Sequence, residues 1–149
     1  MEPRQVRTAA DARELVESRG AQHVKVGVFD IDGIMRGKYI SRDKFLSSLD
    51  GGFGFCDVVL GWDCQDQLYD NVKYTGWHTG YPDAPVRILP DTCRELPFED
   101  NGLFFLGEFS PPSETVCPRA LSRRVLERGR SMGYEAYVGF EDEFFVFSE

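Results

Sequence analysis

Residues 23–40 read HVKVGVFDIDGIMRGKYI, and this stretch decides the fold. Val24, Val26 and Val28 alternate with other residues, which is the period-two pattern of a strand with one buried face. Asp32-Gly33 is a strong turn signal, and residues 34–40 continue as a second extended segment. The stretch therefore predicts a β-hairpin. Because no crossover helix separates its two strands, it favours an α+β domain over a doubly wound sheet.

The flanking sequence predicts few helices and several strands. Thr8 and Asp11 form a capping pair before a short amphipathic helix that ends at Gly20. A second short helix is predicted over 43–49, and an aromatic loop over 56–81. Further strands are predicted at 86–89, which ends at Pro90-Asp91, and at 94–96, 103–109 and 134–147, with a helix from Pro118 to Gly133 before the last one.

Composition limits the classes of partner. The chain has 149 residues, of which 42% are hydrophobic and 28% charged, as in one ordinary soluble domain. Its net charge of -8 disfavours binding to nucleic acid or to an anionic membrane, because both need clustered Lys and Arg. The four cysteines show no CxxC pair, and the amino terminus shows no apolar leader. We therefore expect reduced thiols, a cytoplasmic location, and small molecules or proteins as partners.

The predicted last strand contains the acids Glu141, Asp142 and Glu143 before an apolar Phe-Phe-Val-Phe run. Side chains alternate along a strand, so Glu141 and Glu143 would share one face about 6.6 Å apart while Asp142 points away. Carboxylate oxygens are the ligands that Mg²⁺ and Mn²⁺ prefer. The pattern therefore indicates a divalent metal site, and the alternative is the solvated end of a strand.

A second acidic motif, Asp30-x-Asp32-Gly33, follows the first strand of the hairpin. It is similar to the motif of haloacid-dehalogenase-like phosphotransferases, in which Asp30 would accept a phosphoryl group and Asp32 would protonate the leaving oxygen. The alternative is that both side chains shape the turn through hydrogen bonds to the backbone. Ile34 in place of a small residue, and the return strand that follows, favour the turn.

Several motifs, taken in order along the chain, resemble the glutamine synthetase superfamily. They are Asp30-x-Asp32-Gly33-x-x-Arg36-Gly37-Lys38, the Gly-Phe-rich bend at 51–55, Pro82-Asp83, Leu89-Pro90-Asp91, Pro118-Arg119 and Glu141-x-Glu143-Phe144-Phe145. The resemblance implies an N-terminal helix over 1–20, a β-grasp-like domain with a mixed sheet over 21–112, and the start of the catalytic domain over 113–149. That last part would contain a helix and the first strand of a truncated catalytic domain.

The same resemblance implies an ATP-dependent ligase in which Glu141 and Glu143 hold catalytic Mg²⁺ or Mn²⁺. ATP would convert glutamate to γ-glutamyl phosphate, and ammonia or an organic amine would then displace phosphate. Active sites would lie between subunits of a ring-shaped homo-oligomer. Since the remaining ligands of the family lie further along its catalytic domain, residues 1–149 alone are expected to be inactive.

The resemblance also assigns two catalytic acids. Asp57 stands one residue from the family's ammonium-binding aspartate, and Asp83 matches a second acidic position. The family's Phe-Asp-Gly-Ser-Ser is replaced by residues 55–59, Phe-Cys-Asp-Val-Val, a departure that resembles γ-glutamyl-amine or polyamine ligases. A non-catalytic β-grasp module that binds partners through the aromatic loop and a sheet edge is the remaining alternative.

Overall fold

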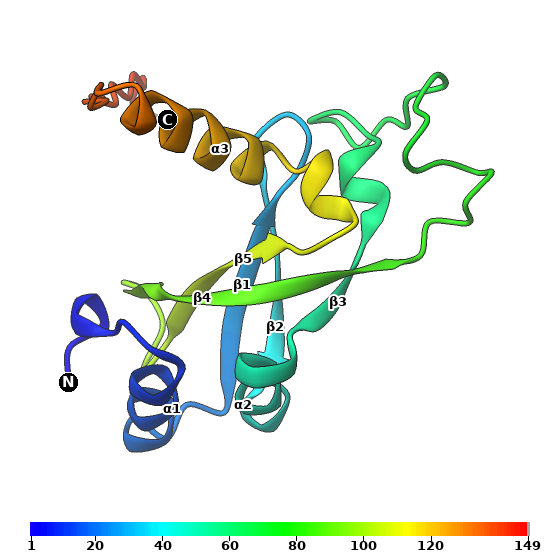
Figure 1. Ribbon diagram of the computed structural model, residues 1–149. Helices are drawn as coiled ribbons and strands as arrows, with labels where there is room; N and C mark the ends of the chain where they lie inside the picture. Colours follow the sequence, from blue (N-terminus) through cyan, green and yellow to red (C-terminus); the bar gives the residue numbers. More distant parts are fainter. Residues whose placement is uncertain (149) are drawn as a thin grey trace.

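The computed structural model describes residues 1–148, which form one five-stranded mixed sheet with helices around it (Figure 1). The strands are β1 (His23–Phe29), β2 (Met35–Ser41), β3 (Phe53–Cys56), β4 (Asp83–Glu95) and β5 (Leu103–Phe109). The helices are α1 (Ala9–Ser18), α2 (Arg42–Gly51) and α3 (Pro118–Ser131), with short 3-10 turns η1 (Pro3–Gln5), η2 (Asp57–Leu60) and η3 (Ser113–Thr115). The α+β class is confirmed, and the arrangement is that of a β-grasp.

The strand order is β2-β1-β5-β4-β3. The central pair, β1 and β5, runs parallel, with Val26 opposite Phe105, and the other neighbouring strands are antiparallel. The β1–β2 hairpin is confirmed, since its register runs from His23 opposite Ser41 to Phe29 opposite Met35. The sheet thus brings the hairpin beside a strand that lies about 80 residues later in the chain.

The amino-terminal helix begins where its capping pair predicts. The Asp11 N–H donates to Thr8 Oγ1 at 3.1 Å, and the Thr8 N–H donates back to Asp11 Oδ2 at 2.9 Å. The helix α2 is also confirmed and ends at Gly52, whose φ of 68° and whose proximity to Val86 exclude a side chain. A Cβ at Gly52 would lie 2.5 Å from the Val86 carbonyl oxygen.

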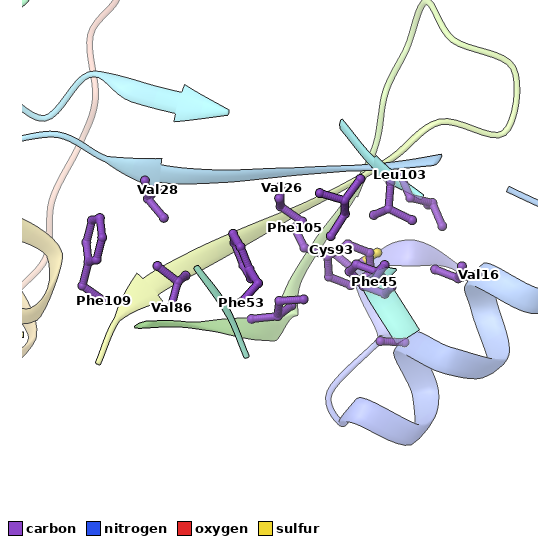
Figure 2. Packing of buried hydrophobic residues seen from close by; sticks show 14 of the residues in the cluster. Val16, Val26, Val28, Phe45, Phe53, Val86, Cys93, Leu103, Phe105 and Phe109 are labelled. Atoms are coloured by element: carbon purple, nitrogen blue, oxygen red, sulfur yellow. The ribbon is translucent and has the colours of Figure 1, made fainter. Parts of the chain in front are cut away.

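The hydrophobic core lies between the sheet and the helices α1 and α2 (Figure 2). The ring of Phe45 on α2 packs on that of Phe105 on β5, with 4.7 Å between centroids. The alternating valines of β1 are fully buried, and each such side chain stabilises the fold by about 1.5–3 kcal/mol. The period-two pattern therefore identified the buried face of the hairpin correctly.

One prediction about the sheet is wrong, because residues 83–95 form a single strand rather than two. Pro90 was expected to end the strand, yet the chain passes it through an irregularity between Leu89 and Arg94. The Thr92 hydroxyl accepts the N–H of Leu106 at 2.9 Å and donates to the Leu89 carbonyl at 2.6 Å. A side chain thus replaces a ladder bond that a bulge disrupts.

The predicted strand at 134–147 is also absent, because Tyr134–Ser148 form neither helix nor strand and are exposed. An isolated strand leaves its backbone groups without hydrogen-bond partners, and in residues 1–148 no neighbouring strand pairs with this segment. The helix before it forms as predicted, but Leu121, Val125 and Met132 are 54%, 60% and 62% exposed. Within residues 1–148, no helix has the length and hydropathy to cross a membrane.

Candidate functional site

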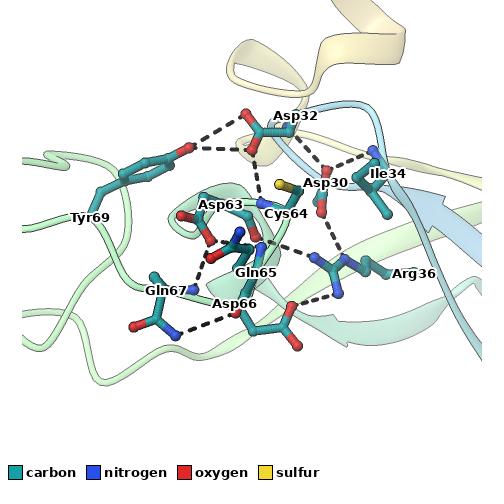
Figure 3. A network of polar contacts seen from close by, with 10 residues as sticks. All are labelled: Asp30, Asp32, Ile34, Arg36, Asp63, Cys64, Gln65, Asp66, Gln67 and Tyr69. Atoms are coloured by element: carbon teal, nitrogen blue, oxygen red, sulfur yellow. Dashed lines mark hydrogen bonds and ion pairs between the residues drawn. The ribbon is translucent and has the colours of Figure 1, made fainter.

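The Asp30 carboxylate organises the turn of the β1–β2 hairpin (Figure 3). Its Oδ1 accepts the backbone N–H of Asp32 at 3.0 Å and that of Ile34 at 2.8 Å. Its Oδ2 accepts the Arg36 Nε–H at 2.7 Å, and the side chain is fully buried. A phosphotransferase nucleophile needs an accessible oxygen, so this geometry supports the turn hypothesis and not the phosphotransferase.

Arg36 ties the hairpin to the loop that follows η2. Its guanidinium lies 2.6 Å from the Asp66 carboxylate, donates to the Asp63 carbonyl at 3.3 Å, and stacks 5.0 Å from the Trp62 ring centre. The hydrogen bond to Asp30, followed by that to Asp66, raises the pKa of Arg36 above its ordinary value. The sequence identified Arg36 as part of a motif but gave no indication of these loop contacts, which are long-range.

Asp32 orients the same loop from the other side of the turn. Its Oδ2 accepts the backbone N–H of Cys64 at 2.9 Å, and the Tyr69 hydroxyl donates to the carboxylate at 3.4 Å. Burial, and then the negative charge of Asp32, raise the pKa of Tyr69. Both acids of the Asp-x-Asp-Gly motif therefore have structural roles in which a side chain fixes a backbone segment.

The structure places the backbones of the two predicted catalytic acids, Asp57 and Asp83, at neighbouring positions. Asp83 begins β4 and is paired in register with Cys56, the residue before Asp57. The Asp57 N–H donates to the carbonyl of Pro82, the residue before Asp83, at 3.0 Å. The two acids therefore lie at one end of the β3–β4 pair, although 26 positions separate them in the chain.

These two acids differ in environment. Asp57 is 4% exposed, and its Oδ1 accepts a 2.6 Å hydrogen bond from the buried Thr75 hydroxyl. Asp83 is exposed. One carboxylate is thus buried and held by a hydrogen bond, and the other is accessible to solvent, so Asp83 is the acid that a cation in solution could contact directly. The sequence gave no signal for the contribution of Thr75.

Glu141 and Glu143, the predicted metal ligands, lie in the exposed segment after α3. Their carboxylates are the donor type that a hard divalent cation takes, so the chemistry of the pair fits Mg²⁺ or Mn²⁺. Within residues 1–148, no group of three or more His, Cys, Asp or Glu side chains is placed to hold a metal ion. No hydrogen bond or ion pair within residues 1–148 joins the pair to Asp57 or Asp83.

Glu108 on β5 forms an ionic cluster that the sequence analysis missed. Its carboxylate is 3% exposed and pairs with Arg87 on the neighbouring strand, and it lies 3.8 Å from Arg119 Nε and 3.6 Å from Arg123 Nε on α3. Hydrogen bonding to Glu114, then the charge of Glu108, raise the pKa of Arg123. The cluster positions α3 beside the sheet, along a cleft of about 400 Å³. The only sequence signal was the arginine-rich composition of the helix.

Comparison with known proteins identifies relatives of one kind. Residues 115–149 match the family model "Glutamine synthetase, catalytic domain". Type-1 glutamine synthetase 2 of Dictyostelium discoideum is 44% identical over 130 residues, covering 85% of this chain and 25% of that protein. Glutamate–isopropylamine ligase of a Pseudomonas species is 31% identical over 144 residues, covering 92% of this chain and 31% of that protein.

A solved structure agrees at the level of the fold. A GmaS/ADP complex superposes with a TM-score of 0.59 over 81% of this chain and 26% of that one, at 14% sequence identity. The chain thus spans about a quarter to a third of the length of the relatives that it matches. The family match lies on α3 and the Glu141-x-Glu143 segment, and the sheet agrees with the β-grasp expected before it. This chain therefore belongs to the glutamine synthetase superfamily.

Proposed function

We propose that this chain is part of an ATP-dependent ligase that joins the γ-carboxylate of glutamate to an organic amine. The observation that carries the proposal is the placement of Asp57 and Asp83 at one end of the β3–β4 pair, in a chain related to a glutamate–isopropylamine ligase. Carboxylates so placed suit a cationic substrate that must lose a proton before it attacks.

The proposed reaction has two steps. An oxygen of the glutamate γ-carboxylate attacks the γ-phosphorus of ATP, which forms γ-glutamyl phosphate and releases ADP. The amine nitrogen then attacks the γ-carbonyl carbon, the C–O bond to phosphate breaks, and phosphate leaves with that electron pair. The proton lost by the nitrogen passes to a carboxylate, a role that we assign to Asp57 and Asp83.

Glu141 and Glu143 are assigned to divalent cations. When bound, Mg²⁺ or Mn²⁺ would neutralise the charge that develops on the transferred phosphoryl group. Residues 1–149 include no residue that we assign to ATP or glutamate, so the isolated chain is expected to lack ligase turnover. We also propose a homo-oligomer in which the acids of one subunit face the metal site of another, as the resemblance to the glutamine synthetase superfamily implies.

An organic amine is favoured over ammonia for a reason that lies in this chain. The residues after Asp57 are Val58 and Val59, so the segment is apolar rather than a Gly-Ser-Ser turn. Apolar surroundings would suit an alkyl substituent better than a fully hydrated ammonium ion.

The test uses the longest protein that the reading frame encodes. Glutamate, ATP and Mg²⁺ are supplied with ammonia, isopropylamine or ethanolamine, and ADP and the γ-glutamyl amide are measured by coupled assay and mass spectrometry. We expect amide formation with the organic amines, and Asp57→Asn and Asp83→Asn should raise the amine KM or lower kcat while the KM for ATP stays unchanged. No amide with any amine would refute the ligase assignment, and unchanged amine kinetics in both variants would refute the roles of the two acids.

A further inference from the structure

The segment 76–81 forms a short loop whose two ends are fastened to Asp57 and its neighbour. At the start, the Thr75 hydroxyl donates to the Asp57 carboxylate at 2.6 Å. At the end, the Pro82 carbonyl accepts the Asp57 N–H, and the Tyr81 carbonyl accepts the Cys56 thiol at 3.4 Å. A compact loop closed in this way is a common site of function, because a rigid scaffold positions its side chains.

This loop holds its backbone in a conformation that side chains rarely adopt. Tyr81 has a φ of 50°, in the left-handed region, directly after Gly80 at 72°. Left-handed backbone at a bulky aromatic residue costs energy and persists only where surrounding contacts impose it. The conformation turns the Tyr81 ring toward Trp77, with centroids 5.4 Å apart and planes at 78°.

Trp77 and Tyr81 line a small cavity together with residues from the first part of the loop. The cavity measures about 270 Å³. Its lining residues also include Tyr69 and Asp70. Trp77 is 83% exposed, so its ring is accessible to a ligand in solution. The lining thus combines Tyr69, Trp77 and Tyr81 with the acid Asp70 and with His78.

The third ring is held in place by the hairpin turn. The Tyr69 hydroxyl donates to Asp32 at 3.4 Å (Figure 3), and the Tyr69 N–H donates to the Gly61 carbonyl at 3.0 Å. Asp32 is itself fixed, because it accepts the Cys64 N–H. The Tyr69 ring is therefore held in position before any ligand binds, which lowers the conformational entropy lost on binding.

We propose that this cavity binds an organic ammonium ion, with its charge beside Asp70 and its alkyl group against the rings of Tyr69, Trp77 and Tyr81. Aromatic faces attract cations and also bury alkyl groups, whereas a carboxylate alone would take any cation. The combination selects an alkylammonium over ammonium, which lacks the apolar group, and over a neutral alcohol, which lacks the charge. Because the loop is fastened to Asp57, the cavity would be the amine subsite of the enzyme. That role rests on the proposed ligase function, whereas binding itself does not.

Binding can be measured on residues 1–149 without ATP or glutamate. The two tryptophans, Trp62 and Trp77, give two indole N–H signals in an ¹⁵N-correlated NMR spectrum. We expect isopropylammonium chloride to shift the Trp77 signal in a saturable manner and to leave that of Trp62 unchanged. Ammonium chloride and isopropanol at the same concentrations should produce much smaller shifts.

Variants locate the binding site. Trp77→Ala should weaken isopropylammonium binding by about three- to thirtyfold, the range that cation–π contacts provide. Asp70→Asn should weaken it while preserving the ring contacts. These two variants are followed through the Tyr69 and Tyr81 resonances. Trp62→Phe is the control, since Trp62 stacks on Arg36 outside the cavity, and it should bind as the parent does. Circular dichroism checks that each variant is folded.

Several outcomes would overturn the inference. They are equal shifts with isopropanol, unchanged affinity in Trp77→Ala, and tighter binding of Nα-acetyl-lysine methylamide, which would assign the cavity to a lysine of a protein.

Failure of the ligase proposal can be distinguished from failure of the cavity proposal. If the cavity binds amines but the longer protein makes no γ-glutamyl amide, the ligase is wrong and the site stands. If the ligase is active and this chain binds no amine, the site is wrong.

Discussion

The hydroxyl of Thr75 donates a 2.6 Å hydrogen bond to Oδ1 of Asp57, and both side chains are almost fully buried. The bond connects a proposed catalytic acid to the first residue of the loop that carries Trp77. The backbone N–H of Asp57 also donates to the Pro82 carbonyl, at the far end of that loop. Asp57 therefore holds both ends of the loop that carries Trp77. Changes at Thr75 should therefore affect both stability and amine recognition.

Replacing Thr75 with Val keeps the shape of the side chain and removes the hydroxyl. The buried Asp57 carboxylate then loses its side-chain donor, and we expect the free energy of unfolding to fall by about 1–3 kcal/mol. Urea denaturation followed by circular dichroism measures this change. Thr75→Ser keeps the hydroxyl and should lose much less stability than Thr75→Val. Unchanged stability in Thr75→Val, together with a loss in Thr75→Ser, would show that the methyl group matters and the hydrogen bond does not.

Arg36 should be far more important for stability than an exposed arginine. Arg36→Met leaves the fully buried Asp30 carboxylate without its counter-charge, so the Tm should fall by roughly 10 °C. The matched control is Arg13→Met, because Arg13 pairs with Asp50 at the surface, and its Tm should change by about 2 °C or less. Differential scanning calorimetry of both variants checks this, and similar Tm values would contradict the structural role of Asp30.

The thiols should react in an order set by burial. Cys64 is exposed, whereas Cys93 is fully buried, and burial raises the pKa of the Cys93 thiol to about 11. Iodoacetamide at pH 8 should therefore modify Cys64 first and leave Cys93 unmodified until the protein unfolds, as followed by mass spectrometry. Early modification of Cys93 would contradict its placement in the core.

The same thiol makes stability depend on alkaline pH. The folded pKa of Cys93 is raised above the ordinary value of 9.0, so the folded state retains this proton where the unfolded state has lost it. Its contribution to stability is complete below about pH 9 and is lost as the pH rises toward 11. Cys93→Ala should weaken this decline relative to the parent chain, as measured by urea denaturation between pH 8 and 11.

Glu141 and Glu143 are tested in the longer enzyme. Each change to Gln keeps the size of the side chain and removes its charge, so turnover should fall by about a hundredfold or more if the residue holds a catalytic cation. Asp142→Asn is the matched control and should retain most activity, because a strand formed by this segment in the longer enzyme would point Asp142 to the opposite face. Wild-type rates for both Gln variants across a Mg²⁺ titration would refute the metal role.

In residues 1–149 alone, the same substitutions should have little effect on stability. Both carboxylates are exposed, and in residues 1–148 they contact no ionic partner, so ΔΔG should remain within about 0.5 kcal/mol. Urea denaturation provides the measurement, and a large loss of stability would indicate that the segment packs on the domain.

Features that depend on neighbouring residues could be predicted from the sequence. The Thr8–Asp11 cap, the β1–β2 hairpin and the buried face of β1 involve interactions across a few positions, and each is found as expected. The hydrogen bonds of Asp30 to the backbone of the turn span two to four residues and follow the same rule. The order of the short motifs also indicated the superfamily, because each motif consists of a few neighbouring residues that can be recognised in the sequence.

The tertiary structure alone decided what joins distant segments. No local pattern indicates that Thr92 bridges the bulge of β4, that Glu108 gathers arginines from β4 and α3, or that Thr75 reaches Asp57. The strand expected at 134–147 illustrates the same limit, because its dense apolar composition indicates a preference that is realised only when another strand supplies hydrogen bonds. Local geometry is encoded within a few residues, whereas contacts between segments depend on how the whole chain packs, and the candidate site consists of such contacts.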